Sequence, residues 1–304
     1  MKKAFSIRVK RKGGKAMDRE GNETAPLDLS IDGLSFQAYE EVDLSWLRPY
    51  GTVFTVMDQR FSGNLDFGVD GRYGKLFIKY AGARTLNYRG RPSDAMKKLQ
   101  NAMPLYERDH PALVRLLAHG EAGNGYAAIF EWKNACPLRP LPYDPATREA
   151  VRRLPLHRQL KMLDMVFDLH AALALDNIIA VDFNDSSVLI DFGSGEAVVS
   201  DIDLYRKKPA VNDRGRMWGS SRFMAPEEYT LGAALDETTT QYNMAALAFE
   251  FFGDNTDRSR KAWVGPTPLF EVASRAVQEQ KGSRYPSMRS FLDAWRQAVG
   301  RCRI

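Results

Sequence analysis

The stretch that decides the fold runs from Ile178 to Tyr205 and has the sequence IIAVDFNDSSVLIDFGSGEAVVSDIDLY. It contains five aspartates and two short apolar runs, Val188–Ile190 and Ala197–Val199, separated by a polar turn. Short apolar runs bounded by Gly, Ser and Asp are typical of the two strands of a β-hairpin. Carboxylates near the mouth of such a hairpin are suited to bind a metal ion and to orient a hydroxyl nucleophile.

Composition and charge narrow the class of protein. With 304 residues, 44% of them hydrophobic and 27% charged, the chain is typical of a soluble globular protein with one large domain or two modest lobes. The formal net charge of +5 suits an anionic ligand, but no stripe of Lys and Arg dominates, so we predict no nucleic-acid partner. The two cysteines, Cys136 and Cys302, lack metal-ligand spacing and predict neither a disulfide framework nor a zinc site.

Targeting and membrane signals are not found in the sequence. The basic start, MKKAFSIRVKRK, has no apolar core of signal-peptide length. No window approaches the roughly 18 consecutive apolar residues that a spanning helix needs. We therefore predict a cytoplasmic protein with no membrane partner.

The first half of the chain has the pattern of β-strands. Residues 1–45 are a predicted β-rich extension, with strands at Phe5–Val9 and Leu27–Ile31 and a turn at Asp18–Asn22. Residues 46–133 follow with one predicted helix, Asp94–Met103, among further strands. These strands are Gly51–Met57, Lys75–Tyr80 and Tyr126–Trp132, and the run Ser62–Val69 carries the loop that joins the first two.

Two features of this half could serve an anion. Gly63 and Gly68 are expected in a loop between strands, where the lack of a Cβ lets backbone N–H groups approach phosphates. Lys79 lies between Ile78 and Tyr80 in an apolar strand, so it is either at an exposed edge or aimed at an anion.

A Pro-rich stretch, Cys136–Pro142, marks the best internal boundary, and residues 134–304 are predicted to be mainly helical. Apolar residues at helical spacing predict a helix over 156–170, on which His170 is interpreted as a satisfied core histidine. Tyr242–Phe252 is apolar nearly all round and predicts a buried central helix, and Met288–Val299 predicts a final amphipathic helix.

The order of these features resembles the protein-kinase superfamily over roughly residues 50–297. The segment Gly219-Ser-Ser-Arg-Phe-Met-Ala-Pro-Glu227 is similar to the family's peptide-positioning loop, and Gly282–Phe291 is similar to a segment near its end. His110–Leu117 resembles the strand after the family's first helix. The resemblance implies an α+β, bilobal protein-kinase-like fold. Its parts are a β-rich extension (1–45), a β-rich N-lobe (46–133) and a mainly helical C-lobe (134–304).

The resemblance also implies which aspartates act. Asp182 takes the place of the catalytic base, although Ala180-Val181-Asp182 replaces His-Arg-Asp. The literal Asp-Phe-Gly at Asp191 lies only nine residues after Asp182, too few for a complete hairpin between them, so we interpret it as the hairpin turn. The metal-binding aspartate then falls at Asp201, nineteen residues after Asp182, with Asp203 as a close competitor.

Several positions depart from the family's pattern. Ser187 stands where the family has a metal-binding Asn, so Asn184 or Asp185 is an alternative metal ligand. Thr240 stands where an aspartate usually supports the catalytic loop. Without the arginine of the triplet, the chain is not expected to need a phosphorylated activation loop, but Tyr205, Ser220 and Ser221 are candidate modification sites.

In the N-lobe the resemblance implies an ATP site. Lys79 matches the lysine that holds the α- and β-phosphates, and Leu65 replaces the middle glycine of the glycine loop. The helix glutamate that pairs with this lysine is missing, which leaves Gln100 or Asp201 as its partner. The remaining nucleotide-binding residues implied are Gly63, Asn64, Gly68, Val69, the gatekeeper Phe130, Glu131 and Lys133.

Three functions fit this pattern. The first is a divergent serine/threonine protein kinase that uses ATP and Mg²⁺ and acts on a protein substrate. The second is a pseudokinase that binds without catalysis. The third is a small-molecule kinase of the aminoglycoside-phosphotransferase kind, a class that generally lacks an Ala-Pro-Glu loop. Independently of activity, the resemblance implies a buried structural salt bridge between Glu227 and Arg284.

Overall fold

The chain is an α+β protein with two compact units, as a computed structural model describes it for residues 8–11, 16–17, 23–72, 74–140, 142–253 and 255–302. The first unit comprises Met1–Glu107 and Arg115–Lys133, and the second comprises Arg108–Val114 and Asn134–Ile304. The first unit thus ends at Lys133, just before the Pro-rich stretch. Within the described residues, no helix is long and apolar enough to cross a membrane.

The first unit is organised around a five-stranded antiparallel sheet in the order β6-β7-β8-β10-β9. Its strands are β6 (Thr52–Met57), β7 (Asn64–Gly71), β8 (Gly74–Ala81), β9 (Leu116–Ala122) and β10 (Gly125–Glu131). Side chains alternate between the two faces of each strand. Leu65, Phe67 and Val69 therefore share one face, where they are fully buried in the core.

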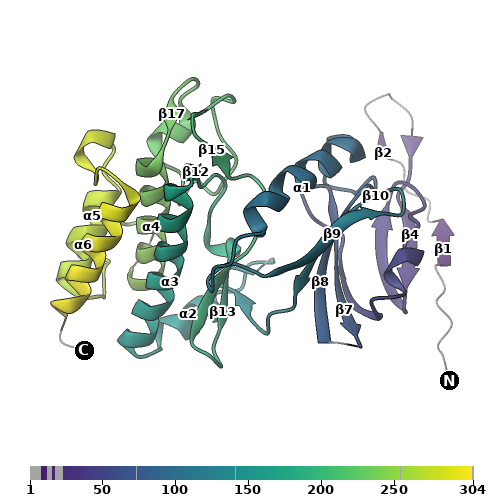
Figure 1. The fold of residues 1–304 in the computed structure, drawn as a ribbon, viewed down its shortest axis with the longest axis horizontal. Helices are drawn as coiled ribbons and strands as arrows, with labels where there is room; N and C mark the ends of the chain where they lie inside the picture. The colour runs from purple at the N-terminus through teal and green to yellow at the C-terminus, as the bar shows by residue number, and fades with distance from the viewer. Residues whose placement is uncertain are drawn as a thin grey trace. The chain divides into compact units, whose positions relative to one another are not determined.

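That core face is covered by the preceding segment rather than by a helix. Strands β1 (Arg8–Arg11), β4 (Leu27–Ile31) and β5 (Leu34–Ala38) form a three-stranded antiparallel sheet, and β2 (Ala16–Met17) pairs with β3 (Glu23–Thr24). Leu29, Ile31 and Phe36 belong to the same hydrophobic cluster as the five-stranded sheet. The extension is therefore one layer of the first unit's core (Figure 1).

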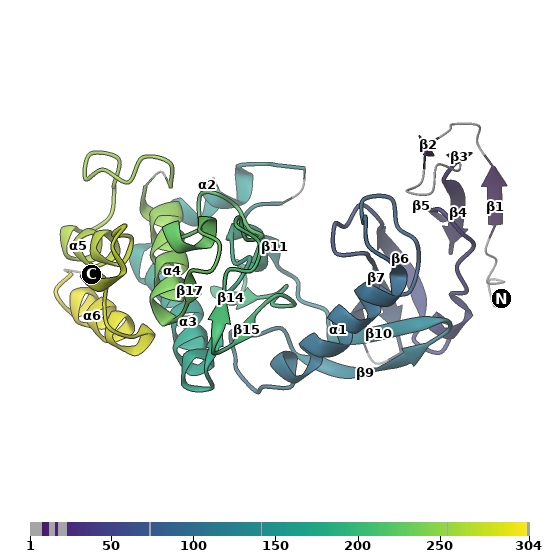
Figure 2. The ribbon, with the colours of Figure 1, turned by 90° about the horizontal axis from the view of Figure 1, so that it is seen from above.

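Helix α1 (Pro92–Tyr106) packs on the opposite face of the sheet, against β8 and β10 (Figure 2). Pro92 stands at the first helical position and Asp94 caps the backbone N–H of Arg91, which are common helix-start signals. Its apolar side faces inward and buries Leu99, Met103 and Tyr106.

The second unit is built around two long helices, α3 (Leu156–Leu175) and α4 (Glu237–Phe252). Helices α5 (Thr267–Ala276) and α6 (Met288–Gly300) pack against α4, and α6 also contacts α3 (Figure 1). Helix α2 (Ala146–Arg152) lies against α4. Helix α4 is buried on nearly every side because helices surround it, which explains its continuous apolar sequence.

Short strands lie between α3 and α4. The hairpin of β13 (Val188–Asp191) and β14 (Glu196–Val199) is extended by β11 (Cys136–Pro137). Strand β12 (Ile178–Ile179) pairs with β15 (Arg206–Lys207), and β16 (Ala210–Val211) pairs with β17 (Ala234–Leu235). The predicted hairpin is thus confirmed, with the second strand beginning one residue earlier than expected.

Most predicted elements are confirmed, and two are corrected. Gly68 lies inside β7 rather than in the loop before it, because the loop ends at Gly63. Strand β9 begins only at Leu116, so most of the predicted strand His110–Leu117 is a connecting segment that belongs to the second unit. The predicted strand residues 5–7 and the predicted turn 18–22 lie outside the described residues.

Candidate functional site

The mouth of the β13–β14 hairpin brings together residues that the sequence singled out. Val188 pairs with Val199, so the next residues outward, Ser187 and Ser200, face each other. The Ser200 N–H donates to the Ser187 carbonyl oxygen at 2.8 Å and extends the ladder by one step. Asp201 follows directly, so Ser187 and Asp201 emerge at the same end of the hairpin. Asp203 lies two residues further on, in the turn closed by the Tyr205 N–H and the Ile202 carbonyl at 3.1 Å.

The literal Asp-Phe-Gly occupies the other end of the hairpin. The Asp191 carboxylate accepts hydrogen bonds from the backbone N–H groups of Gly193 at 2.8 Å and Ser194 at 3.2 Å. Its carbonyl accepts from Gly195, which has a φ of +70°. Asp191 therefore caps the turn, as predicted. At roughly 3.4 Å per strand residue, it is about 14 Å along the strand from Ser187.

Asp182 and Asp201 share an uncommon backbone conformation. Their φ angles are +65° and +59°, in the left-handed region that disfavours side chains other than those of Gly, Asn and Asp. Such conformations are held by the surrounding structure and cluster at functional sites. Asp182 and Asp201, which the sequence predicts as base and metal ligand, thus both have this left-handed backbone.

The loop that carries Asp182 is held by three hydrogen bonds. The Asn184 amide donates to the Asp182 carbonyl at 3.0 Å, and its oxygen accepts from the Ser186 N–H. The Ala180 N–H donates to the Thr240 hydroxyl on α4 at 3.1 Å. Thr240 therefore supports this loop from helix α4.

Asp185 is engaged by an arginine that sequence reasoning did not select. The Arg222 guanidinium donates to both Asp185 carboxylate oxygens at 2.7 and 2.8 Å, and also bonds Glu250 at 2.9 Å. Burial raises the pKa of Asp185, although the charge and bonds of Arg222 oppose this shift. As an alternative metal ligand, Asp185 is thus disfavoured, because both oxygens are directed at Arg222.

The Gly219–Glu227 loop begins close to Asp182. Gly219 has a φ of +137°, and a Cβ at this position would stand 3.1 Å from the Met224 side chain and 3.7 Å from the Asp182 Cα. A side chain here would strain the backbone and would require the Met224 side chain to shift. This close approach places the start of the loop beside Asp182.

His170 and Tyr205 form a buried hydrogen-bonded pair. His170 Nδ1 bonds the Val166 carbonyl at 2.7 Å and must donate, so the neutral ring accepts the Tyr205 hydroxyl at Nε2, also at 2.7 Å. Burial lowers the pKa of His170 to about 4, which keeps the ring neutral, and the core role predicted for it is confirmed. Tyr205 is buried and bonded, which makes it unsuitable as a modification site.

The pKa of the Tyr205 phenol is shifted by its surroundings. Burial raises the pKa of the Tyr205 phenol well above its ordinary value, and the charges of Asp182 and Asp201 raise it further. Asp182 also contributes to a second shift: burial raises the pKa of Glu228 to about 7, and the charges of Glu227 and Asp182 add to it.

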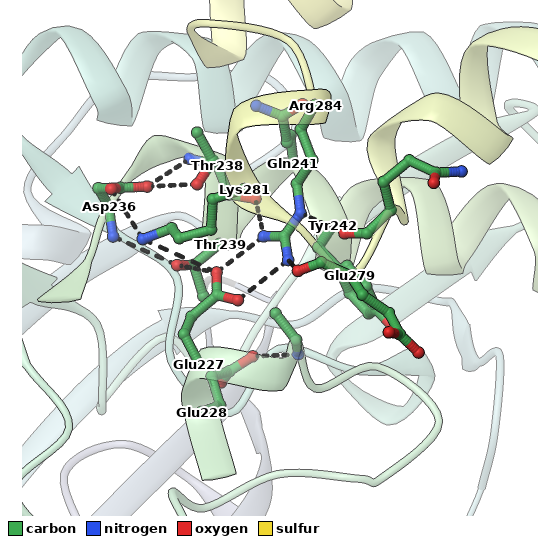
Figure 3. A network of polar contacts seen from close by, with 12 residues as sticks. Glu227, Glu228, Asp236, Thr238, Thr239, Gln241, Tyr242, Glu279, Lys281 and Arg284 are labelled. Atoms are coloured by element: carbon green, nitrogen blue, oxygen red, sulfur yellow. Dashed lines mark hydrogen bonds and ion pairs between the residues drawn. The ribbon is translucent and has the colours of Figure 1, made fainter. Parts of the chain in front are cut away.

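The Ala-Pro-Glu end of the loop is anchored by a saturated ion pair (Figure 3). Arg284 donates to the two Glu227 carboxylate oxygens at 2.8 and 3.0 Å, and its other N–H groups bond the carbonyls of Thr238, Gln278 and Glu279. All five guanidinium donors are therefore used. The Arg284 side chain is 0% exposed, so the predicted buried salt bridge is confirmed.

In the first unit, Lys79 lies on the face of the sheet that α1 covers. It is 6% exposed, and its ammonium lies 5.7 Å from the centroid of the Tyr106 ring. It is therefore not the exposed edge lysine that the sequence left open. The predicted partner Gln100 is exposed on α1, whereas Asp66, which sequence reasoning missed, stands directly opposite Lys79 on β7. In a tight hairpin, counting back from the turn by equal numbers of residues on the two strands places Asp66 opposite Lys79, and this count could have identified it.

The glycine positions are packed by the protein's own side chains. A Cβ on Gly63, whose φ is +86°, would stand 2.7 Å from the Tyr88 ring, and one on Gly68 would stand 2.6 Å from Phe54 and Thr55. Asn64 is buried on the face of Lys79. Val69 is separated from Lys79, because its side chain enters the core on the opposite face.

The end of β10 carries the last group of predicted residues. Phe130 is buried, and its ring packs edge-on against Tyr106 of α1 with centroids 4.9 Å apart. The Glu131 N–H donates to the Arg115 carbonyl at 3.0 Å. Lys133, just beyond the strand, pairs with the Glu131 carboxylate at 3.1 Å.

Within the described ranges, no three His, Cys, Asp or Glu side chains converge as a preformed metal site. No protein-family model matches the sequence, and no curated protein matches it significantly. The functional assignment therefore depends on the geometry of these residues.

Proposed function

We propose that this protein is a phosphotransferase with a bilobal, protein-kinase-like fold that transfers the γ-phosphoryl group of ATP to a serine or threonine hydroxyl of a protein. The observation that carries the proposal is the geometry at the hairpin mouth: Asp201 directly follows the last ladder step between Ser187 and Ser200, and the Gly219 loop closely approaches the Asp182 backbone. A four-pair hairpin separates these aspartates in the chain, and both have a left-handed backbone.

Asp182 is assigned as the group that orients the acceptor hydroxyl and takes its proton. Its loop is fixed by Asn184 and Thr240, so little reorganisation is needed when substrate binds. The Gly219 loop beside it is assigned to hold the segment that carries the acceptor hydroxyl. A protein substrate is favoured over a small molecule because this loop is anchored by the buried Glu227–Arg284 pair.

The residues at the hairpin mouth fit Mg²⁺ that arrives with a nucleotide. Mg²⁺ prefers oxygen ligands and is usually held by one or two carboxylates together with substrate phosphates, so no preformed cluster is needed. Asp201 is exposed, and Ser187 is tied to Ser200 next to it. Bound Mg²⁺ would neutralise charge on the phosphates. Lys79 is assigned to the α- and β-phosphates.

The decisive test compares two aspartates at opposite ends of one hairpin. Asp201→Asn should abolish Mg²⁺-dependent binding of a non-hydrolysable ATP analogue, measured by calorimetry. Asp191→Asn is the matched control and should retain it, because the Asp191 carboxylate accepts hydrogen bonds from the turn at the opposite end of the hairpin. The reverse result would make the literal Asp-Phe-Gly the metal site and overturn the assignment.

Transfer is tested by incubating the purified chain with labelled Mg·ATP and a mixture of protein and aminoglycoside acceptors. Label on serine or threonine is expected. Label on the aminoglycoside alone would indicate the small-molecule kinase, and nucleotide binding without any transfer would indicate the pseudokinase. Failure to bind nucleotide at all would overturn the proposal.

A further inference from the structure

Two opposite charges face each other inside the first unit. Asp66 on β7 and Lys79 on β8 are direct cross-strand partners in an antiparallel pair. Side chains at such positions lie on the same face with their Cβ atoms about 5 Å apart. Asp66 is 3% exposed and Lys79 is 6% exposed, so both charges are removed from water.

Burial of this kind requires compensation. An ionised side chain withdrawn from water is tolerated only when it is paired and hydrogen-bonded. Helix α1, which covers this face, turns Leu99, Met103 and the Tyr106 ring toward the sheet, and it has no acid between Asp94 and Tyr106. A ring face attracts an ammonium weakly and does not neutralise it. Asp66, on the neighbouring strand and the same face of the sheet, is an acid placed to supply a compensating charge.

Asp66 is also linked to the loop that precedes β7. Its Oδ2 lies 2.9 Å from Nε of Arg60, whose side chain is 39% exposed. A carboxylate can accept from two cations at once because it has two oxygens. Asp66 is thus placed to connect the loop of residues 58–63 to the amine of Lys79.

We propose that Asp66 is the positioning residue of Lys79: it supplies, from the neighbouring strand, the negative charge that holds the lysine amine toward the phosphates of the nucleotide. Arg60 fixes the carboxylate from the loop side. This inference rests on the proposed function for its nucleotide part, whereas the pairing itself stands on the geometry of the sheet.

The chain offers a matched control on the same two strands. Asp70 and Lys75 form another cross-strand Asp–Lys pair in the same register, but both residues are exposed. Asp70→Asn should leave nucleotide affinity and stability nearly unchanged, because exposed pairs contribute little.

The first measurement is binding of Mg·ATP to the full chain. Asp66→Asn should weaken it about tenfold or more, the loss expected for one charge-assisted hydrogen bond. Asp66→Glu should restore part of the affinity, and the KM of the acceptor protein should stay unchanged. Affinity equal to that of Asp70→Asn would overturn the positioning role.

The second measurement does not depend on nucleotide. Urea midpoints are compared for Asp66→Asn, Lys79→Met and the double variant. Either single change leaves one buried charge unpaired, so the double variant should be more stable than the sum of the single losses implies. Additive losses would overturn the pairing. If wild-type protein binds no nucleotide but the losses are non-additive, the proposed function fails while the Asp66–Lys79 pair stands.

Discussion

Two groups of carboxylates in the second unit illustrate different uses of the same chemistry. Glu227 is buried and bonded to a saturated guanidinium, and Thr239 donates a further bond to it at 2.7 Å. Asp182 and Asp201 instead sit in left-handed backbone conformations, and their charges act on Tyr205. A buried carboxylate that is paired with a fully hydrogen-bonded arginine fits a structural role. The left-handed backbone of Asp182 and Asp201 is of a kind that clusters at functional sites, in agreement with the chemical roles proposed for them.

The substitution Asp182→Asn is expected to have the largest effect and tests whether Asp182 has a chemical or a structural role. Phosphoryl transfer should fall by roughly 10²–10⁴-fold, because the amide cannot accept the acceptor's proton. The free energy of unfolding should change by less than about 1 kcal/mol, since Asn tolerates the left-handed backbone. Initial rates with labelled Mg·ATP and urea titrations measure the two effects. A large stability loss with an unchanged rate would make Asp182 structural.

The substitution Arg284→Met tests the structural role of the Glu227–Arg284 ion pair. Breaking a buried pair by removing one partner should cost about 3–5 kcal/mol in urea unfolding, because Glu227 is left with an uncompensated charge. The matched control is Arg296→Met, which removes an arginine that bonds Asp164 and Asp168 at the surface and is itself 39% exposed. That change should cost less than about 1 kcal/mol. Equal losses in the two variants would contradict the structural role of Arg284.

Glu228 should give the folding stability a smaller dependence on pH. The pKa of Glu228 is about 7 in the folded protein and 4.5 as its ordinary value, so the folded state holds an extra proton between these values. The stability contribution of Glu228 is therefore full below about pH 4.5 and is lost as the pH rises through 7, by about 3 kcal/mol at most. Glu228→Gln keeps an acceptor for the Ala225 N–H and should flatten this loss in urea titrations at pH 5 and 8. An unchanged pH profile would mean that Glu228 is already ionised.

Local pattern and residue spacing predicted much of this architecture. The hairpin, helices α3, α4 and α6, and the Glu227–Arg284 pair follow from periodicity or from motifs with recognisable ends. Asp66 and Arg222 were missed because each matters through a partner that the fold supplies, on the next strand or 37 residues earlier in the chain. Gly68 was assigned to a loop because sequence does not show that Phe54 fills the space above it.

The turn at Asp191–Gly195 has a practical consequence for spectroscopy. Gly193 and Ser194 at its tip are exposed, while the ladder behind them leads rigidly to the mouth with Ser187 and Asp201. A dye on Ser194→Cys, after both native cysteines are replaced by serine, would sit about four strand residues from the site without touching it. The motif that resembles a catalytic signature is thus the best attachment point for a reporter of ligand arrival.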